Sequence, residues 1–490
     1  MRKIIDLQMQ FWEKNIADIE FDLQSRDEIP KLLMGLQYIY STAPLRKKVF
    51  EILKQIVPKK DHETGRPGMD LWKILVLGTL RINCNWDFDK VQEMANNHTK
   101  LREMLGHCKT DFDSSYALQT IRDNIALLTP SILDKINQIV VKAGHSLLSN
   151  KKDPELRCSC DSFVVETDVH YPTDINLLFD AMRKTISLIA IICSEIGITA
   201  WRQSHHNIMA VKRLMRIIQK LKRSTSKDKV KKIKRDNLIV MKHQNYIEIC
   251  QRFVLKAKET IHLLRELDLI SATQELRLRT IEVYIRHAER QIDQIYRRVV
   301  LDENIPHEEK VFSIFEPHTE WISKGKAGIS QELGLMVCVI KDQFGFILHH
   351  LVMQHQTDNK VAVFMVQRTK DRFENLVGCS FDKGFHSPEN QRDLTNMLDY
   401  VILPKKGRLS VKDKQVEQSA EYKENRRKHS AVESSINALE NHGLDRCRDH
   451  GEHGFERYVA LSVLARNIQI LGHLLQQKEL NRQKRRKAAA

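Results

Sequence analysis

The chain has 490 residues and a mass of 57.3 kDa, a length that suits about two or three domains. Its 79 lysines and arginines outnumber 63 aspartates and glutamates, and the formal net charge of +16 favours a polyanionic partner such as nucleic acid. No apolar run approaches the roughly 18 residues of a membrane span, and the N-terminus lacks the apolar segment of a secretory signal. Nine scattered cysteines, an odd number, are typical of reduced thiols. We therefore expect a cytoplasmic protein without a membrane partner.

Residues 1–150 are predicted to be helical. Apolar side chains recur at roughly helical spacing up to about residue 60, a turn follows at residues 64–68, and Asp70 can cap the next helix. Short helices joined by polar turns permit a helix-turn-helix DNA reader, in which Arg66 is a candidate DNA contact. An ordinary helical bundle explains the same pattern, because no recognition helix can be singled out by spacing.

A strand and a long helical region come next. Residues 162–169 alternate toward β-structure and include Asp168 at the strand end, and the sequence from residue 179 to about 300 is almost purely helical. Within that region, residues 212–235 include twelve basic side chains and one acid, Asp228. Such a run is usually a solvated face or a mobile loop, but beside a catalytic core it could also track phosphates. We expect a large helical insertion or a long helical hairpin.

After residue 306 the sequence predicts short strands with a hairpin connection at residues 341–345. One strand leads to Asp382, Ser387 can cap the next helix, and helical sequence returns from about residue 422. The order of elements suits an RNase H-like α/β core, a mixed sheet with flanking helices, interrupted by the helical insertion and preceded by an all-α domain. The predicted domains are a helical DNA-binding domain at 1–150, the first part of the core at 160–176, the helical insertion at 177–305, the remainder of the core at 306–476 and a basic tail at 477–490.

Acidic residues near the end of the first predicted strand are candidate metal ligands. Asp168 closes the strand, and Glu166 and His170 share its side at a two-residue period, so any of the three could face a metal ion. Asp174 is a fourth candidate, although its simpler role is in the first turn of the following helix. We favour Asp168.

Two more carboxylates follow later in the chain. Gly384 lies just after Asp382 and permits a tight exit from the strand, so the carboxylate can project at the strand end; a plain turn aspartate is the alternative. Glu433 lies on a predicted helix whose apolar side includes Val432 and Ile436, and it points away from that side. Asp168, Asp382 and Glu433 are therefore the predicted set.

Four basic residues come just before Glu433. Arg426, Arg427, Lys428 and His429 are expected just before or inside the first turn of its helix, where positive charge opposes the helix macrodipole. A bound phosphate backbone would offset that conflict, so these residues are candidate DNA contacts. His429 could orient a carboxylate or the scissile phosphate, and a solvent-facing histidine is the alternative.

Carboxylates that converge in one site repel each other, and each raises the pKa of the other. Divalent cations relieve this cost, and two of them about 3.5–4 Å apart can clamp the attacking and leaving oxygens of a phosphodiester. Hard oxygen ligands favour Mg²⁺ or Mn²⁺ over zinc. His442, Cys447, His450 and His453 match no standard zinc-finger spacing. We expect two Mg²⁺ or Mn²⁺ ions.

Three segments together resemble the catalytic blocks of bacterial insertion-sequence transposases of the DDE class: residues 166–174, 382–390 and 429–446. Residues 65–106 are similar to the N-terminal helical domain of such transposases. The resemblance implies that Asp168, Asp382 and Glu433 bind the metal ions. It also implies double-stranded DNA with terminal inverted repeats as substrate, target DNA as the second partner, and a homodimer or higher assembly on DNA.

The sequence thus predicts a DNA transposase that cleaves the ends of a mobile element and joins the 3′-hydroxyl to target DNA. Two alternatives stay open. One is an RNase H-like metal-dependent nuclease that cleaves without joining. The other is a non-catalytic DNA-binding protein derived from a transposase, although the three intact acids argue against it.

Overall fold

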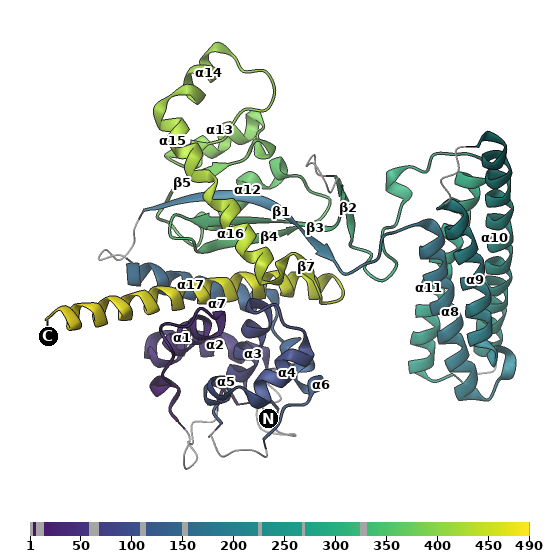
Figure 1. Cartoon of the computed structure of the whole chain (residues 1–490), viewed down its shortest axis with the longest axis horizontal. Coiled ribbons are helices and arrows are strands. Elements are labelled where there is room, and N and C mark those ends of the chain that lie inside the picture. The colour runs from purple at the N-terminus through teal and green to yellow at the C-terminus, as the bar shows by residue number, and fades with distance from the viewer. Residues whose placement is uncertain are drawn as a thin grey trace. The chain divides into compact units, whose positions relative to one another are not determined.

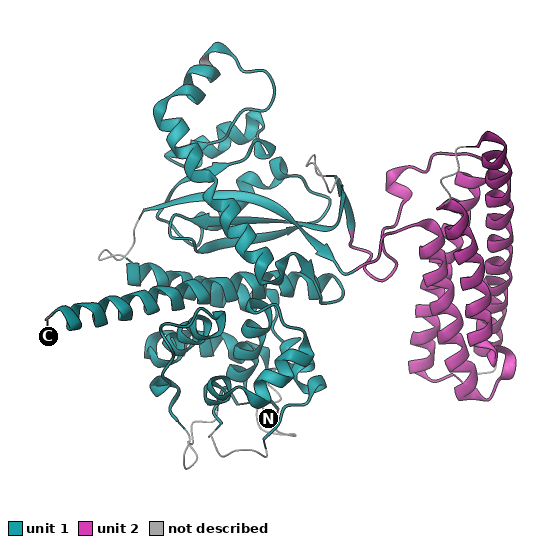
Figure 2. Ribbon diagram, in the orientation of Figure 1, with its two compact units in different colours: residues 1–168, 320–490 teal, residues 169–319 magenta. Residues whose placement is uncertain are grey.

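The computed structural model describes residues 3–5, 14–57, 68–107, 114–148, 155–223, 228–266, 270–323 and 331–489. The chain forms two compact units, which are residues 1–168 with 320–490 and residues 169–319 (Figure 2). The N-terminal helices and the sheet belong to the same unit. The second unit extends beyond the predicted insertion at both of its ends.

The first unit is built on one mixed β-sheet (Figure 1). Its central strand, β1 (Leu156–Thr167), is antiparallel to β3 (Gln331–Asp342) on one side and parallel to β5 (Leu376–Phe381) on the other. The other strands are β2 (Glu320–Ser323) and β4 (Ile347–Met353), both antiparallel to β3, β6 (Tyr400–Ile402), parallel to β5, and β7 (Arg446–Cys447), parallel to the end of β1. The mixed sheet expected from the order of the strands is therefore present.

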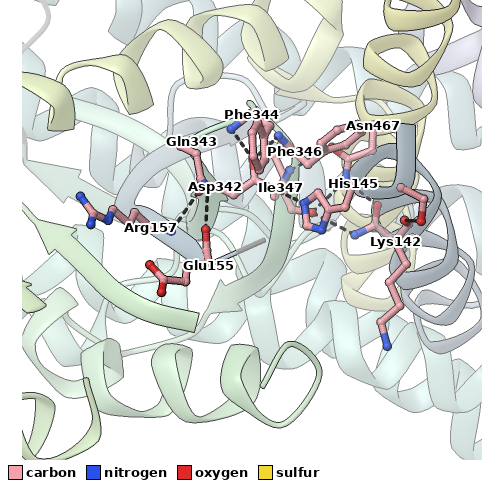
Figure 3. Close-up of polar contacts among 12 residues, drawn as sticks. Lys142, His145, Glu155, Arg157, Asp342, Gln343, Phe344, Phe346, Ile347 and Asn467 are labelled. Carbon is pink, nitrogen blue, oxygen red and sulfur yellow. Dashed lines mark hydrogen bonds and ion pairs between the residues drawn. The ribbon is translucent and has the colours of Figure 1, made fainter. Parts of the chain in front are cut away.

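The turn between β3 and β4 also fixes where β1 begins. Asp342 Oδ1 accepts two backbone N–H groups of this turn, each at 2.9 Å, and so closes the predicted hairpin. Gln343 then reaches the first residues of β1, accepting the N–H of Arg157 at 2.9 Å and donating to the carbonyl of Glu155 at 2.8 Å (Figure 3). The strand consequently starts at Leu156, well before the predicted start at residue 162.

Helices cover both faces of the sheet. α12 (Asp358–Lys370) and α13 (Pro388–Met397) share a core with Cys158 and Cys160 of β1. α16 (Ala431–Leu439) and α17 (Glu452–Ala489) contribute to a core that contains Phe163 and Val165. Successive side chains of a strand point to opposite faces. Cys158 and Cys160 therefore face one helical layer, and Phe163 and Val165 face the other.

The N-terminal helices are α1 (Glu28–Ser41), α2 (Ala43–Leu53), α3 (Leu71–Asn83), α4 (Phe88–Asn97), α5 (Thr99–Met104), α6 (Leu118–Ile125) and α7 (Pro130–Leu148). Of these, α1, α3 and α7 pack on α17. Gly35 of α1 and Gly472 of α17 lie where each helix meets the backbone of the other, leaving no room for a Cβ. Asp70 precedes α3 as predicted, but its carboxylate lies 3.2 Å from Lys73 Nζ and makes no capping hydrogen bond.

α17 contains a stretch long and apolar enough to cross a membrane, which the sequence analysis did not anticipate. Among the described residues it is the one helix with this property. In the structure 72% of that stretch is buried, because it packs against α1, α3 and α7. Burial of this kind is typical of a core helix in a large domain.

The second unit is a helical bundle with its own apolar core. Its α-helices are α8 (Asp174–Ile196), α9 (Ser204–Lys222), α10 (Lys229–Glu266) and α11 (Ala272–Val299). Thr173 Oγ1 accepts the N–H of Asn176 and starts α8, and Gly197, with φ +82°, ends it. Trp201 Nε1 donates to Thr260 Oγ1 at 3.0 Å inside the core.

Candidate active site

The parallel pairing of β1 with β5 brings two aspartates together. Cys160 of β1 is the partner of Phe381 of β5, and the next residues along the two strands are Asp161 and Asp382. Neighbouring strands lie about 4.8 Å apart. The two carboxylates therefore project from adjacent backbone positions, where β5 ends and β1 continues.

Asp161 lies in a strongly acidic environment. Burial raises the pKa of its carboxyl to about 6, and the negative charges of Asp382, Asp358 and Glu433 act in the same direction. The backbone N–H of Ser162 donates to Asp161 Oδ1 at 2.8 Å and opposes this rise. Asp161 is therefore within electrostatic range of all three carboxylates.

Glu433 reaches this group from α16. The preceding helix, α15 (Ala420–His429), ends at His429, whose Nδ1 lies 3.0 Å from Ser380 Oγ of β5. Burial lowers the pKa of His429, while the charges of Asp382 and Glu433 partly restore it. Lys341 Nζ of β3 donates to the carbonyl of Ala431 at 2.8 Å and holds the start of α16 on the sheet. His429 thus faces the acidic group, not solvent.

Asp358 adds a fourth carboxylate from the opposite side of the sheet. It is the first residue of α12, and its Oδ1 accepts the hydroxyl of Ser162 at 2.6 Å. Its Oδ2 would lie 2.7 Å from a Cβ at residue 384, so the glycine there makes room for it. Burial raises the pKa of Asp358, and the charge of Asp382 raises it further. Asp358 therefore links β1 to the turn after β5.

Asp168 does not join Asp382 and Glu433. It follows Asp161 by seven positions, which is about 23 Å along a strand at 3.3 Å per residue. Its side chain is 58% exposed, and its Oδ1 lies 3.7 Å from Arg446 Nη1. The structure therefore places Asp168 away from Asp382, because β1 starts earlier than predicted and pairs with β5 through its first half. The grouping of Asp168 with Asp382 and Glu433 stays a prediction from the sequence.

The alternatives to Asp168 also lie elsewhere. Glu166 is 3.0 Å from Arg446, and both residues line a separate cavity of about 470 Å³ that also contains Asp168. His170 Nε2 is 3.3 Å from Asp180 Oδ2. Asp174, in the first turn of α8, lies 2.5 Å from Arg298. Glu166 and Asp174 are thus paired with arginines and His170 with an aspartate. In the described part of the chain, none of Asp161, Asp358, Asp382 and Glu433 forms an ion pair with a basic side chain.

The basic residues before Glu433 lie just before its helix, as expected. Arg426, Arg427, Lys428 and His429 form the last turn of a separate helix, α15, where positive charge is favourable to the macrodipole of that helix. The two arginines and the lysine are exposed, and Lys428 Nζ lies 2.8 Å from Glu424. Arg66 lies outside the described residues.

The donors around Asp161 suit a hard cation, because they are carboxylates whose charges disfavour one another. These carboxylates lie farther apart than the ligands of one metal ion. Within the described ranges, no group of three or more His, Cys, Asp or Glu side chains is close enough to hold a metal ion. This statement includes the segment around Cys447, whose Sγ donates to the carbonyl of Asp449.

Asp161 and Asp358 are the residues that sequence reasoning missed. Asp161 stands as a single acid inside a short run of small residues, Cys158 to Ser162, and this interruption of a buried strand was the available signal. Asp358 had no such signal, since an acid in the first turn of a helix is explained by the macrodipole alone.

The family described as the transposase DDE domain matches residues 303–468. This segment contains Asp382 and Glu433 but begins after β1, so Asp161 and Asp168 both lie outside it. The search of curated proteins and the search of solved structures each find no match to the chain.

Residues 303–468 are therefore a transposase DDE domain, which confirms the resemblance to DDE-class insertion-sequence transposases. A domain of this family implies a DNA substrate and a divalent-metal-dependent reaction that cuts or transfers DNA strands.

Proposed function

We propose that this chain is a DNA transposase that cleaves the ends of a mobile element and joins the freed 3′-hydroxyl to target DNA. The observation that carries the proposal is the convergence of Asp161, Asp382 and Glu433, two of which lie inside a transposase DDE domain. The sheet order β4-β3-β1-β5-β6, antiparallel on one side of β1 and parallel on the other, supports an RNase H-like core.

Asp161 replaces Asp168 in the proposed set of catalytic carboxylates. The reason is electrostatic as well as geometric, since the charges of Asp382 and Glu433 both act on Asp161, whereas Asp168 is exposed beside Arg446. Asp161, Asp382 and Glu433 would hold Mg²⁺ or Mn²⁺, with Asp358 beside them. When bound, two such ions stabilise the charge on the attacking and leaving oxygens of a phosphodiester.

The remaining roles belong to the protein. His429, held by Ser380, is proposed to orient Glu433 or the scissile phosphate, and its lowered pKa keeps it neutral near pH 7. Ser162 is proposed to position Asp161, because its backbone N–H donates to the Asp161 carboxylate. Asp358 in turn accepts the hydroxyl of Ser162. In cleavage, the oxygen of water forms a bond to phosphorus, the P–O3′ bond breaks, and the 3′-oxygen takes a proton.

Joining repeats the same exchange on a second strand. The element's 3′-oxygen loses its proton and bonds to a target phosphorus, while the target P–O3′ bond breaks and that 3′-oxygen gains a proton. The number of phosphodiester bonds is unchanged, so joining needs no external energy source. Substrate DNA with terminal inverted repeats, target DNA and a homodimer or higher assembly complete the proposal.

Exposed basic side chains are proposed to hold the DNA backbone. Arg426 and Arg427 extend from the end of α15, on the helix that delivers His429 to the acidic group. The predicted basic tail continues α17, and Lys478, Arg482, Arg485 and Arg486 line a surface hollow there. Phosphate contacts of this kind weaken steeply as salt rises.

The test uses a duplex with the flanking ends of the element and a separate target duplex, incubated with the full chain and Mg²⁺. We expect cleavage at the element end and a joined product, both lost in Asp161→Asn, Asp382→Asn and Glu433→Gln. Cleavage without any joined product would favour a nuclease of the same fold. Absence of nicking in the wild type would favour the non-catalytic alternative and overturn the proposal.

A further inference from the structure

The first turns of α10 extend past the rest of the helical bundle (Figure 1). Tyr246 Oη donates to the carbonyl of Ile175 at 3.0 Å, which places residue 246 beside the first turn of α8. The first buried side chain along α10 is that of His243. Residues 229–242 thus form a helical extension, about 21 Å long at 1.5 Å per residue, that buries none of its described side chains.

This extension, residues 229–242, is strongly basic. Lys231 Nζ lies 4.0 Å from Asp228, and Arg235 Nε lies 3.4 Å from Asp236. In the part of the chain that the structure describes, no ion pair is formed by Lys229, Lys232 or Lys234. These three side chains are fully available to an external anion.

Neighbouring elements add to the positive charge at this end of the bundle. Lys222 and Arg223 end α9 and are exposed. The charges of α8 and α11 are instead neutralised internally, because Asp174 lies 2.5 Å from Arg298. Excess positive charge at this end is therefore concentrated on the start of α10 and the end of α9.

These lysines are unfavourable to their own helix. Positive charge in the first turns opposes the macrodipole, and like charges three positions apart, as in Lys229 and Lys232 or Lys231 and Lys234, repel each other. No buried contact in the described structure compensates for this cost. A polyanion bound along the extension would relieve both kinds of repulsion at once.

We propose that the extension of α10, together with the end of α9, binds the phosphate backbone of DNA without regard to base sequence. The choice of DNA as the polyanion rests on the proposed function. At about 100° per residue, the basic residues 229, 231, 232, 234 and 235 span the wider part of the helix circumference, and exposed Val230 and Ile233 lie on the narrower remaining part. A helix that lies in a membrane surface instead buries a broad apolar face. An anionic lipid surface is therefore an outcome of the test and not the proposal.

The test compares two triple variants of the full chain that change the net charge equally. In the first, Lys229, Lys232 and Lys234 are each replaced by glutamine. In the control, glutamine replaces Arg252, Arg286 and Arg290, which are exposed on the same unit but away from the extension. Affinity for a duplex of unrelated sequence is measured by fluorescence anisotropy in EDTA over a series of salt concentrations.

Each phosphate contact contributes about 0.9 to the slope of log affinity against log salt concentration. We expect the lysine triple to reduce the slope by about 2–3 and the arginine triple to leave it within about 0.5 of wild type. An unchanged slope in the lysine triple, or equal loss in both triples, would overturn the inference. If the lysine triple loses binding to phosphatidylserine vesicles but binds DNA like wild type, the extension binds a membrane surface and the inference is also overturned.

Binding in EDTA keeps this test separate from catalysis. If the wild type fails to cut DNA while the lysine triple alone loses affinity, the proposed function fails and the binding surface stands. If cleavage depends on Asp161 while the lysine triple binds DNA like wild type, only the binding surface fails. Thermal unfolding midpoints of both triples verify that the bundle remains folded.

Discussion

Asp161→Asn should abolish DNA cleavage and at the same time stabilise the metal-free protein. Burial, helped by the charges of Asp382, Asp358 and Glu433, raises the pKa of Asp161 from 3.8 to about 6. One pKa unit corresponds to about 1.4 kcal/mol. Ionised Asp161 therefore costs the folded state up to about 3 kcal/mol at pH 7, and we expect asparagine to recover about 1–3 kcal/mol of this.

The pH dependence of this stabilisation has a definite sign. Because the folded pKa of Asp161 lies above its unfolded value, the folded state binds the proton more tightly. The cost of ionisation is present above about pH 6, shrinks as the pH falls, and disappears below about pH 4. Wild type and Asp161→Asn should therefore differ in free energy of unfolding at pH 7 and converge near pH 4.

The assay is urea unfolding of the full chain in EDTA at both pH values, together with end cleavage in Mg²⁺. Asp168→Asn is the matched control on the same strand, and a change at an exposed site is expected to stay within about 0.5 kcal/mol. Near-normal cleavage by Asp161→Asn would show that this carboxylate is not needed for the reaction. A lower free energy of unfolding for Asp161→Asn than for wild type at pH 7 would show that its ionisation does not cost the folded state stability. Loss of cleavage in Asp168→Asn alone would restore Asp168 as the first acid.

Three further predictions test the surroundings of the site and the two cores. Asp358→Asn keeps an oxygen that can accept the hydroxyl of Ser162 but removes the negative charge. It should raise the Mg²⁺ concentration needed for half-maximal cleavage about 10–100-fold, and the control Ser162→Ala should raise it less. Equal effects of the two variants would contradict a role for the charge of Asp358. Gly472→Val should lower the free energy of unfolding by at least about 1–3 kcal/mol, because a side chain there meets the backbone of α1; unchanged stability would show that the helices separate easily. Burial lowers the pKa of His243 to about 4, so the unfolded chain protonates first and the bundle should lose up to about 3 kcal/mol between pH 6.5 and 4. His243→Gln should flatten that loss, measured by the fluorescence of the bundle's tryptophan, whereas exposed His262→Gln should not.

Local signals were sufficient to predict where Asp382 and Glu433 lie in their elements. Gly384 after Asp382 indicated the tight strand exit, which the structure accounts for through Asp358. The prediction that Ser387 caps α13 is confirmed, since its hydroxyl accepts the N–H of Asn390. Glu433 is exposed and lies beside the buried side formed by Val432 and Ile436, as the spacing indicated.

Asp161, the proposed first acid, could not be found in the same way, because its position beside Asp382 is fixed by strand register and not by local pattern. Which residue of β1 faces Asp382 depends on the pairing of Cys160 with Phe381, two positions more than 200 residues apart. Asp161 and Asp168 are seven positions apart, an odd number, so in a regular strand their side chains point to opposite faces, and spacing alone does not say which face Asp382 shares. Asp161 therefore became visible only when the parallel pair was seen.

The positions of the basic residues also depended on tertiary structure. Where α15 ends and α16 begins decides whether Arg426 and Arg427 oppose or favour a helix dipole. The carbonyl of Ala431, held by Lys341 from a distant strand, contributes to that boundary. Sequence spacing contains no record of this contact.

Binding of Mn²⁺ to the metal-free full chain, measured by electron paramagnetic resonance, distinguishes Asp161 from Asp168 as the first metal ligand. Wild type and Asp168→Asn should bind the ion alike, whereas Asp161→Asn and Asp382→Asn should bind it at least about 10-fold more weakly. Equal Mn²⁺ binding by wild type and Asp161→Asn, with weaker binding by Asp168→Asn, would contradict this prediction.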